Sequence, residues 1–210
     1  MRPKTYDLDV ADESLTGFAS NVTGAAFVLT ATAPSDGLAH QVSIRNDSAN
    51  NHSGKTVTLV GTDADGKALT EVVTGPTGNA TVESAGYFKT LTSATPSSTI
   101  GADTFDIGWV DEVASQTIPI DWRSDAQAAI HVDVTGTLNF TVQQTFGPIQ
   151  QPVTRKPQQD NAWTDITALA SKTADTAGQA TPGATAIRIL YNSYSSGAEL
   201  QMYVSQPARS

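Results

Sequence analysis

The chain has 210 residues, no cysteine and a formal net charge of −9, with a pI near 4.6. A chain of this length can bury about 70% of the surface that its unfolded form exposes, so it can fold without a disulfide or a metal. The lack of cysteine excludes thiol catalysis, cysteine-ligated zinc and disulfide bonds. The acidic balance argues against a basic surface for nucleic acid, and we expect no nucleic-acid partner.

The N-terminal stretch MRPKTYDLDVADESLTGF carries Arg2 and Lys4 but lacks the apolar run of a secretory signal. No later segment approaches the roughly 20 apolar residues of a membrane-spanning helix, so we expect a protein made in a cytoplasm, with no membrane partner. Acidic residues follow Lys4 closely, which makes this stretch polar enough to predict an arm rather than a core strand. Such an arm either moves freely or lies on a neighbouring subunit, with Arg2 and Lys4 in the contact.

Short segments that alternate apolar and polar residues dominate the chain and predict β-strands. They are Gln41–Arg45, Thr56–Val60, Leu69–Val73, Ala80–Glu83, Phe105–Trp109, Ala129–Val134, Thr137–Gln143, Ala186–Tyr191 and Leu200–Val204. Their Val, Ile and Thr side chains suit a pleated, half-buried surface and are poor helix formers. The best helical pattern, Thr164–Thr173, would supply one or two turns at most. The prediction is an all-β fold.

Charge and a weak internal repeat predict two domains. Residues 1–112 hold 14 acidic and 6 basic residues, whereas residues 113–210 hold 7 and 6. Segments that begin at Ala33 and Ala180 share one order of turn, strand, loop and strand, which hairpin chemistry explains as well as duplication does. We therefore predict two small antiparallel β-sandwiches, Ig-like or jelly-roll-like, formed by residues 1–112 and 113–210, with extended loops and the N-terminal arm.

The segment GPIQQPVTRKPQQDN, residues 147–161, interrupts the strands of the second half. Its three prolines favour extended backbone and exclude it from the middle of a sheet. Long loops in compact domains are either mobile or functional. Two interpretations therefore stay open: a mobile hairpin tip, or an arm on a neighbouring subunit where Arg155 and Lys156 meet acidic groups.

The stretch TVTLVGTDADGKALTEVVT contains DADG, a sequence also found in calcium loops. With Gly66 at the sixth position of an EF-hand loop, Asp63 and Asp65 take the third and fifth positions. Gly61 and Val72 then fall where the first and last ligands belong. The flanks alternate like strands, and Asp-Gly between such flanks is a strong hairpin signal because glycine accepts a positive φ. The sequence predicts a hairpin turn here, and no metal or cofactor.

No motif for catalysis stands out. A Gly-x-Ser-x-Gly turn, a phosphate-binding loop and a dinucleotide fingerprint are all missing from the sequence. His40 and His131 lie in or beside strand patterns, where a half-exposed sheet residue is the ordinary explanation, and His52 lies in a predicted solvated loop tip. We therefore expect a protein that is not an enzyme.

The tryptophans are most simply explained as closing the ends of the sandwich cores. Alternatively, Trp122 or Trp163 anchors an interface, because tryptophan is enriched at binding hot spots. Tyr191 and Tyr194, around YNSYSSG, could stack on a sugar or pack at the end of a hairpin.

Two parts of the sequence resemble virion structural proteins of tailed bacteriophages. One is the threonine-rich unit TVTLVGTDADGKALTEVVTGPTGNATVESAGYFKTLTSATPSSTIGADTFDIGW, whose hairpin, loop and YF-K-T-xx-S layout is similar to that of phage head and tail surface proteins. The other runs from VDVTGTLNFTVQQTF through AWTDI to TPGATAIRILYNSYSSGAELQMYVSQ and resembles a small sandwich domain of phage particles. The resemblance implies a particle component without catalytic residues.

The sequence thus predicts a structural protein of a phage virion, assembled in the host cytoplasm. Its most specific form is a capsid decoration, or cement, protein that contacts the major capsid protein and self-associates as a homo-oligomer. The nearly neutral second half would dock and the acidic first half would face solvent. The alternatives are a neck, tail-adaptor or fibre-attachment protein, a carbohydrate-binding module with Trp122, Trp163, Tyr191 or Tyr194 as platforms, and a hydrolase with a carboxylate pair.

Overall fold

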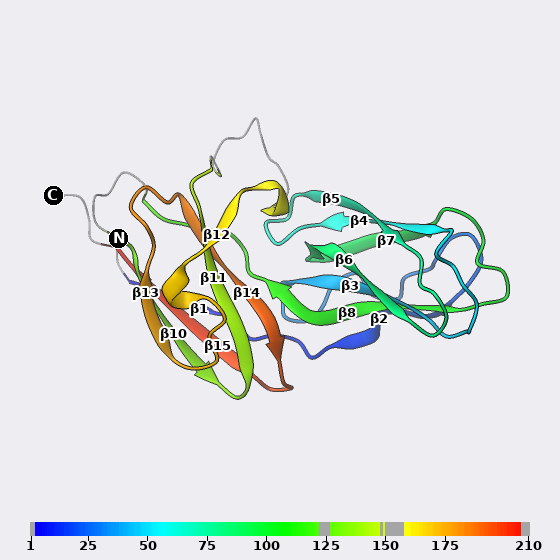
Figure 1. The fold of residues 1–210 in the computed structure, drawn as a ribbon, viewed down its shortest axis with the longest axis horizontal. Coiled ribbons are helices and arrows are strands. Elements are labelled where there is room, and N and C mark those ends of the chain that lie inside the picture. Colours follow the sequence, from blue (N-terminus) through cyan, green and yellow to red (C-terminus); the bar gives the residue numbers. More distant parts are fainter. Residues whose placement is uncertain (1–2, 122–126, 148, 150–157, 207–210) are drawn as a thin grey trace. The chain divides into compact units, whose positions relative to one another are not determined.

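The computed structural model describes residues 3–121, 127–147, 149 and 158–206. Almost all of its regular structure is β-strand, which confirms the all-β prediction (Figure 1). The chain divides into two compact units. The N-terminal unit comprises Glu13–Asp111, and the C-terminal unit comprises Met1–Asp12 together with Glu112–Ser210.

The N-terminal unit is built from two groups of antiparallel strands. The first contains β2 (Ser14–Val22), β3 (Ala39–Asn46), β6 (Thr81–Phe88) and the first part of β8 (Phe105–Ala114), in the order β8-β3-β6 with β2 paired to β8. The second is a three-stranded sheet in the order β5-β4-β7, with β4 (Thr56–Thr62) between β5 (Ala68–Thr74) and β7 (Thr90–Pro96).

Alternation along these strands creates a single core. Val42 and Ile44 on β3 are fully buried, as are Leu59 on β4 and Leu91 on β7, and these residues belong to one hydrophobic cluster. Burial of each such side chain contributes about 1.5–3 kcal/mol relative to leaving it exposed. The strand positions in between face outward, which leaves one face of the three-stranded sheet uncovered by this cluster.

The C-terminal unit also contains two sheets. One has the order β1-β15-β10-β13, formed by Lys4–Asp7, Glu199–Ser205, Ala129–Thr135 and Thr176–Gln179. In the other, β12 (Trp163–Asp165), β11 (Leu138–Thr145) and β14 (Ala186–Tyr194) are joined by the last residues of β8 and by β9 (Ile118–Pro119). Two short 3-10 helices, Gln158–Asp160 and Thr167–Leu169, complete the unit.

All nine predicted strands are present, with boundaries shifted by a few residues. The predicted helical pattern over Thr164–Thr173 supplies one 3-10 turn. The N-terminal stretch differs from the prediction, because Lys4–Asp7 forms an edge strand that pairs antiparallel with β15. The first twelve residues belong to the C-terminal unit and not to the N-terminal one. Alternation is weak in KTYD because an edge strand buries little of either face.

Among the described residues, no helix has the length and apolar character needed to cross a membrane.

Candidate functional site

The outward side of β4, β5 and β7 forms a surface that we call the threonine face. Its members on β4 and β5 come from alternate strand positions, and those on β7 lie next to β4 across a register irregularity near Gly61. They are Thr58, Val60 and Thr62 of β4, Thr70, Val72 and Thr74 of β5, and Thr90, Thr92, Ser93 and Thr95 of β7. Threonine and valine fit such a pleated surface because their β-branched side chains pack well across strands.

Two valines on the threonine face are exposed although they are apolar. Val72 is 60% exposed and Val60 is 37% exposed. They occupy adjacent rows of the β4–β5 ladder, since Thr58 faces Val72 and Val60 faces Thr70. Around them, hydroxyl groups are partly occupied by local contacts: Thr62 and Thr90 share a hydrogen bond of 2.7 Å, and Thr92 donates to the Val60 carbonyl at 2.9 Å.

The threonine face carries no charge, whereas the unit around it is strongly acidic. The N-terminal unit, residues 13–111, holds 10 acidic and 4 basic residues, and none of them is a member of the threonine face. Cores of protein–protein interfaces are depleted of charged residues in the same way. An uncharged patch with two exposed valines is therefore chemically suited to contact another protein.

Glu71 of β5 links the edge of this sheet to β6. Its carboxylate accepts hydrogen bonds from the backbone N–H groups of Ala85 at 2.6 Å and Gly86 at 2.8 Å, both on β6. This contact links the edge strands of the two sheets and satisfies backbone donors that an open edge would otherwise present.

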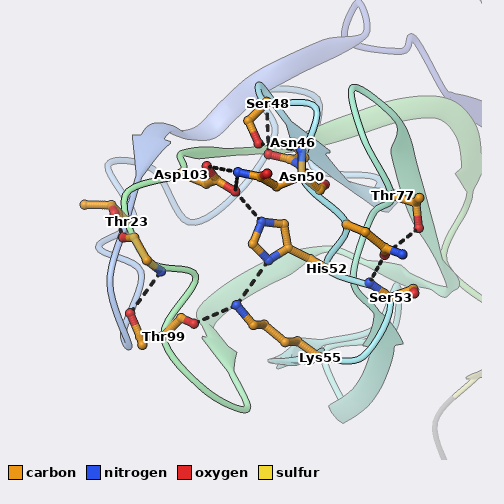
Figure 2. A network of polar contacts seen from close by, with 12 residues as sticks. Thr23, Asn46, Ser48, Asn50, His52, Ser53, Lys55, Thr77, Thr99 and Asp103 are labelled. Carbon is orange, nitrogen blue, oxygen red and sulfur yellow. Dashed lines mark hydrogen bonds and ion pairs between the residues drawn. The ribbon is translucent and has the colours of Figure 1, made fainter.

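At the loop end of the same unit, a polar network surrounds His52 (Figure 2). His52 is only 4% exposed, and its ring packs edge-on against Phe105 with centroids 5.1 Å apart. Its Nε2 lies 2.6 Å from Asp103 Oδ2, and its Nδ1 lies 3.2 Å from Lys55 Nζ. Asn50 also donates to Asp103, at 2.9 Å, and Lys55 donates to the Thr99 carbonyl at 2.8 Å.

Both ring nitrogens of His52 therefore have partners. With Nε2 donating to the carboxylate, Nδ1 is the acceptor nitrogen and receives a hydrogen bond from the Lys55 ammonium group. The hydrogen bond from His52 lowers the pKa of Asp103 below its ordinary value of 3.8, with a further contribution from Asn50. A general base needs a lone pair that reaches substrate, and here Lys55 occupies it. The network connects the β3–β4 loop to the β7–β8 loop.

The environments of His40 and His52 differ from the predicted ones. His40 is fully buried, with Nε2 2.7 Å from Asp36 Oδ2 and Nδ1 3.0 Å from the Val110 carbonyl oxygen. Neither histidine is half-exposed or solvated, because each ring lies between a partner near in sequence and one that is distant in sequence, Val110 for His40 and Asp103 for His52. His131 does lie on an exposed sheet position, beside Asp133 at 2.6 Å.

The DADG turn joins β4 and β5 as predicted, and Gly66 has a φ of 72°. Asp63 is 2% exposed, and its Oδ1 accepts backbone hydrogen bonds from Asp65 at 2.9 Å and from Lys67 at 2.8 Å. Its carboxylate thus caps the turn, as aspartate does in Asx-turns. Across the described ranges, no group of three or more His, Cys, Asp or Glu side chains is placed to hold a metal.

Of the six predicted contact residues, the structure describes only Lys4 and Trp163. Lys4 lies on the exposed edge strand β1. Trp163 lies on β12, where the Arg188 guanidinium stacks 4.5 Å from its ring centroid and its Nε1 donates to the Gln158 carbonyl at 2.8 Å. Arg2, Trp122, Arg155 and Lys156 lie outside the described residues.

Arg188 is itself 93% buried and is hydrogen-bonded to glutamine side chains. The Trp163 ring therefore packs against a fixed, internal part of the unit. Arg188 donates to Gln143 Oε1 at 2.8 and 2.9 Å and to Gln158 Oε1 at 2.8 Å. The ring of Tyr191 is not accessible to a sugar. Tyr191 is 1% exposed, and the hydroxyls of Tyr191 and Tyr194 donate to the backbone carbonyls of Leu8 and Ala11.

The threonine face was missed at the level of sequence although its signal is present. In TVTLVGT and ALTEVVT, the residues at outward strand positions are threonine, valine and alanine, with no charge. An exposed strand face usually carries Lys, Glu or Arg in some of these places. The absence of charged residues from the outward positions of two adjacent strands was the sequence signal for this surface.

No protein-family profile and no curated protein matches this chain. Two solved structures were found by comparison of folds. One belongs to a study of the triple jelly-roll fold and turret assembly of an archaeal virus, with 12% identity and a TM-score of 0.19. The chain spans 58% of that protein's length, and 97% of the chain is covered. The other is the major capsid protein P2 of bacteriophage PM2, with 10% identity, a TM-score of 0.21 and 99% coverage of both chains. Likenesses this weak carry no functional argument.

Proposed function

We propose that this protein is a non-enzymatic structural component of a bacteriophage particle, and that its specific role is that of a capsid decoration protein bound to the major capsid protein. The observation that carries the proposal is the threonine face, an uncharged sheet surface with exposed Val60 and Val72 on an otherwise acidic unit. The resemblance of the threonine-rich sequence to phage particle proteins adds to it, since this sequence forms the threonine face.

The mechanism of docking is burial of a preformed surface. The sandwich core fixes β4 and β5, so that the face loses little backbone freedom when a partner covers it. The two valines supply apolar area at the centre, and the surrounding threonines supply a polar rim, the arrangement found in specific interfaces. Acidic groups elsewhere on the unit keep the particles soluble and apart.

This assignment differs from the sequence-based orientation, in which the second half docks through Arg155 and Lys156. That orientation was inferred from the net charge of each half of the chain. A net charge is a sum over all faces of a domain, so it does not show that one face is uncharged while the others are acidic. One experiment can distinguish the two orientations, because each predicts a different set of docking residues.

The test is decoration of purified capsids by the recombinant protein and three variants. Val72→Glu places a charge in the middle of the threonine face, and we expect it to reduce the bound copy number at least tenfold, because a buried unpaired carboxylate is costly. Val28→Glu is the matched control, since Val28 is 76% exposed in the same unit and outside the threonine face. We expect it to bind like the unmodified chain.

A double variant, Arg155→Glu with Lys156→Glu, examines the other orientation. Loss of binding only in this variant would assign docking to the proline-rich segment and overturn the role of the threonine face. Failure of the unmodified chain to bind capsids would remove the decoration role itself. Quantitative mass spectrometry of the particle then separates hundreds of copies, as expected for a decoration protein, from the tens or fewer expected for a neck or tail component.

A further inference from the structure

The exposed face of the four-stranded sheet in the C-terminal unit contains a hollow that the proposed function does not use. Its volume is about 740 Å³. The floor is made of small residues, among them Ala129 on β10, Ala177 on β13 and Ser205 on β15. In the register of the sheet, Ala129 faces both Gln179 and Ser205. A row of short side chains between longer ones produces a depression on a surface that would otherwise be level.

An aromatic wall borders this floor. Tyr203 and His131 are directly opposite each other on neighbouring strands, with ring centroids 6.0 Å apart and planes inclined by 37°. The Tyr203 hydroxyl donates to Gln201 Oε1 at 2.8 Å, which holds the ring in place. Together the two rings present a continuous aromatic surface on the outside of the sheet.

Polar groups without full charge complete the lining. Gln127 and Gln179 contribute amides, which can both donate and accept hydrogen bonds. His131 Nε2 donates to Asp133, so Nδ1 is the acceptor nitrogen of that ring. Among the described residues that line the hollow, none is Asp, Glu, Lys or Arg. The Asp133 carboxylate lies beside this lining and is paired with His131 at 2.6 Å.

We propose that this hollow binds a neutral oligosaccharide, with one sugar ring stacked on Tyr203 and His131 and its hydroxyls paired with Gln127 and Gln179. Sugars combine apolar C–H faces with rows of hydroxyls, so an aromatic wall next to uncharged amides matches both parts. Small-ligand sites are usually concave and mainly apolar, with a few convergent polar groups. The site does not include Tyr191 or Tyr194, and the inference is independent of the threonine face.

The test is titration of the ¹⁵N-labelled full-length chain with maltotriose, chitotriose and xylotriose, followed by NMR. We expect at least one of these sugars to bind with a Kd of about 1 mM, the range of a small open site, and to shift the amide signals of Ala129, His131 and Ala177. Trilysine peptide and sialyllactose serve as cationic and anionic probes. Neither should shift those signals at the same concentration.

Two variants and one matched control locate the site. Tyr203→Ala removes the aromatic wall, and Ala129→Leu fills the floor; each should weaken binding at least tenfold. Thr135→Leu adds a similar leucine at an exposed position of the same strand, outside the hollow, and should leave the Kd unchanged within about twofold. The chemical shifts of the N-terminal unit report whether each variant is folded.

Three results would overturn the proposal: no response to any of the three neutral sugars up to about 10 mM, unchanged binding in Ala129→Leu, or tighter binding of either charged probe. None of them bears on capsid binding through the threonine face, which is measured separately.

Discussion

At the scale of single residues, the buried polar side chains of the N-terminal unit act by joining segments that are far apart in sequence. His40 connects Asp36 to the backbone of β8, and His52 connects Asp103 to Lys55. Buried polar groups of this kind contribute little when paired but are costly when one partner is removed. Their replacement therefore probes the fold more strongly than replacement of exposed residues of the same type.

Replacement of His40 should be strongly destabilising. His40→Leu leaves the Val110 carbonyl and the Asp36 carboxylate without the imidazole, and we expect a loss of about 2–4 kcal/mol in the free energy of unfolding. His131→Leu is the control because the His131 side chain is 51% exposed, and it should change the free energy by less than about 0.5 kcal/mol. Urea denaturation measures both; equal losses would contradict the role of His40.

Asp103 should make the N-terminal unit sensitive to acid. Its pKa is lower in the folded protein than the ordinary 3.8, mainly because of the His52 hydrogen bond. A carboxyl group of this kind stabilises the fold above about pH 4, and the stabilisation disappears as the pH falls through the folded-state pKa. In Asp103→Asn this group no longer titrates, so the melting temperature should fall less steeply between about pH 5 and pH 3. Identical slopes in the two proteins would exclude this contribution.

At the scale of elements, the strands are held in register by close backbone contacts as well as by side chains. A Cβ atom placed on Gly61 of β4 would lie 1.9 Å from the Thr90 carbonyl oxygen of β7. The register of β4 and β7 shifts between Val60 and Gly61, so this glycine lies at the irregularity of the ladder. Glycine in a strand often marks such a close approach.

Gly61→Ala should therefore destabilise the three-stranded sheet by about 2–4 kcal/mol, because the backbone of β7 has to move. Gly54→Ala is the matched control, since a Cβ atom at Gly54 meets nothing within 4 Å. It should change the stability by no more than about 0.5 kcal/mol. Thermal denaturation followed by circular dichroism compares the two variants, and similar melting temperatures would show that β7 can yield without cost.

The sequence predicted the elements better than it predicted the site. Alternation located nine strands because each buries one face, and Asp-Gly located the β4–β5 turn. It did not locate β2, whose register with β8 is irregular, or β7 and β9, or the short edge strands β1, β12 and β13. The contact between His52 and Asp103 and the aromatic pair of His131 and Tyr203 depend on which strands and loops become neighbours in the fold. Local sequence patterns do not reveal that arrangement.

At the scale of the whole molecule, charge and exposed apolar surface act against each other. The net charge of −9 keeps copies apart near neutral pH, and it vanishes near the pI of 4.6. As the pH is lowered towards that value, the repulsion between copies disappears, and their uncharged threonine faces can approach each other.

We therefore expect self-association to rise as the pH approaches 4.6, and to involve the threonine face. Val72→Glu and Val28→Glu change the net charge equally, so any difference between them reports position. Light scattering near pH 5 should show less association for Val72→Glu than for Val28→Glu, by severalfold in second virial coefficient or aggregate mass. Equal suppression by the two variants would mean that net charge alone controls association.

The pairing of β1 with β15 has a consequence for the order of events during synthesis. Lys4 faces Val204 in this ladder, so β1 is synthesised long before its partner strand exists. Residues 13–111 are a contiguous unit and meet no such delay, and domains emerging from the ribosome generally fold as units in N- to C-terminal order. A nascent chain stalled once residues 13–111 have left the exit tunnel should thus carry a protease-resistant unit, preceded by a segment that is still cleavable. A tag or cargo fused ahead of residue 4 would disturb the unit that contains β15 and not residues 13–111.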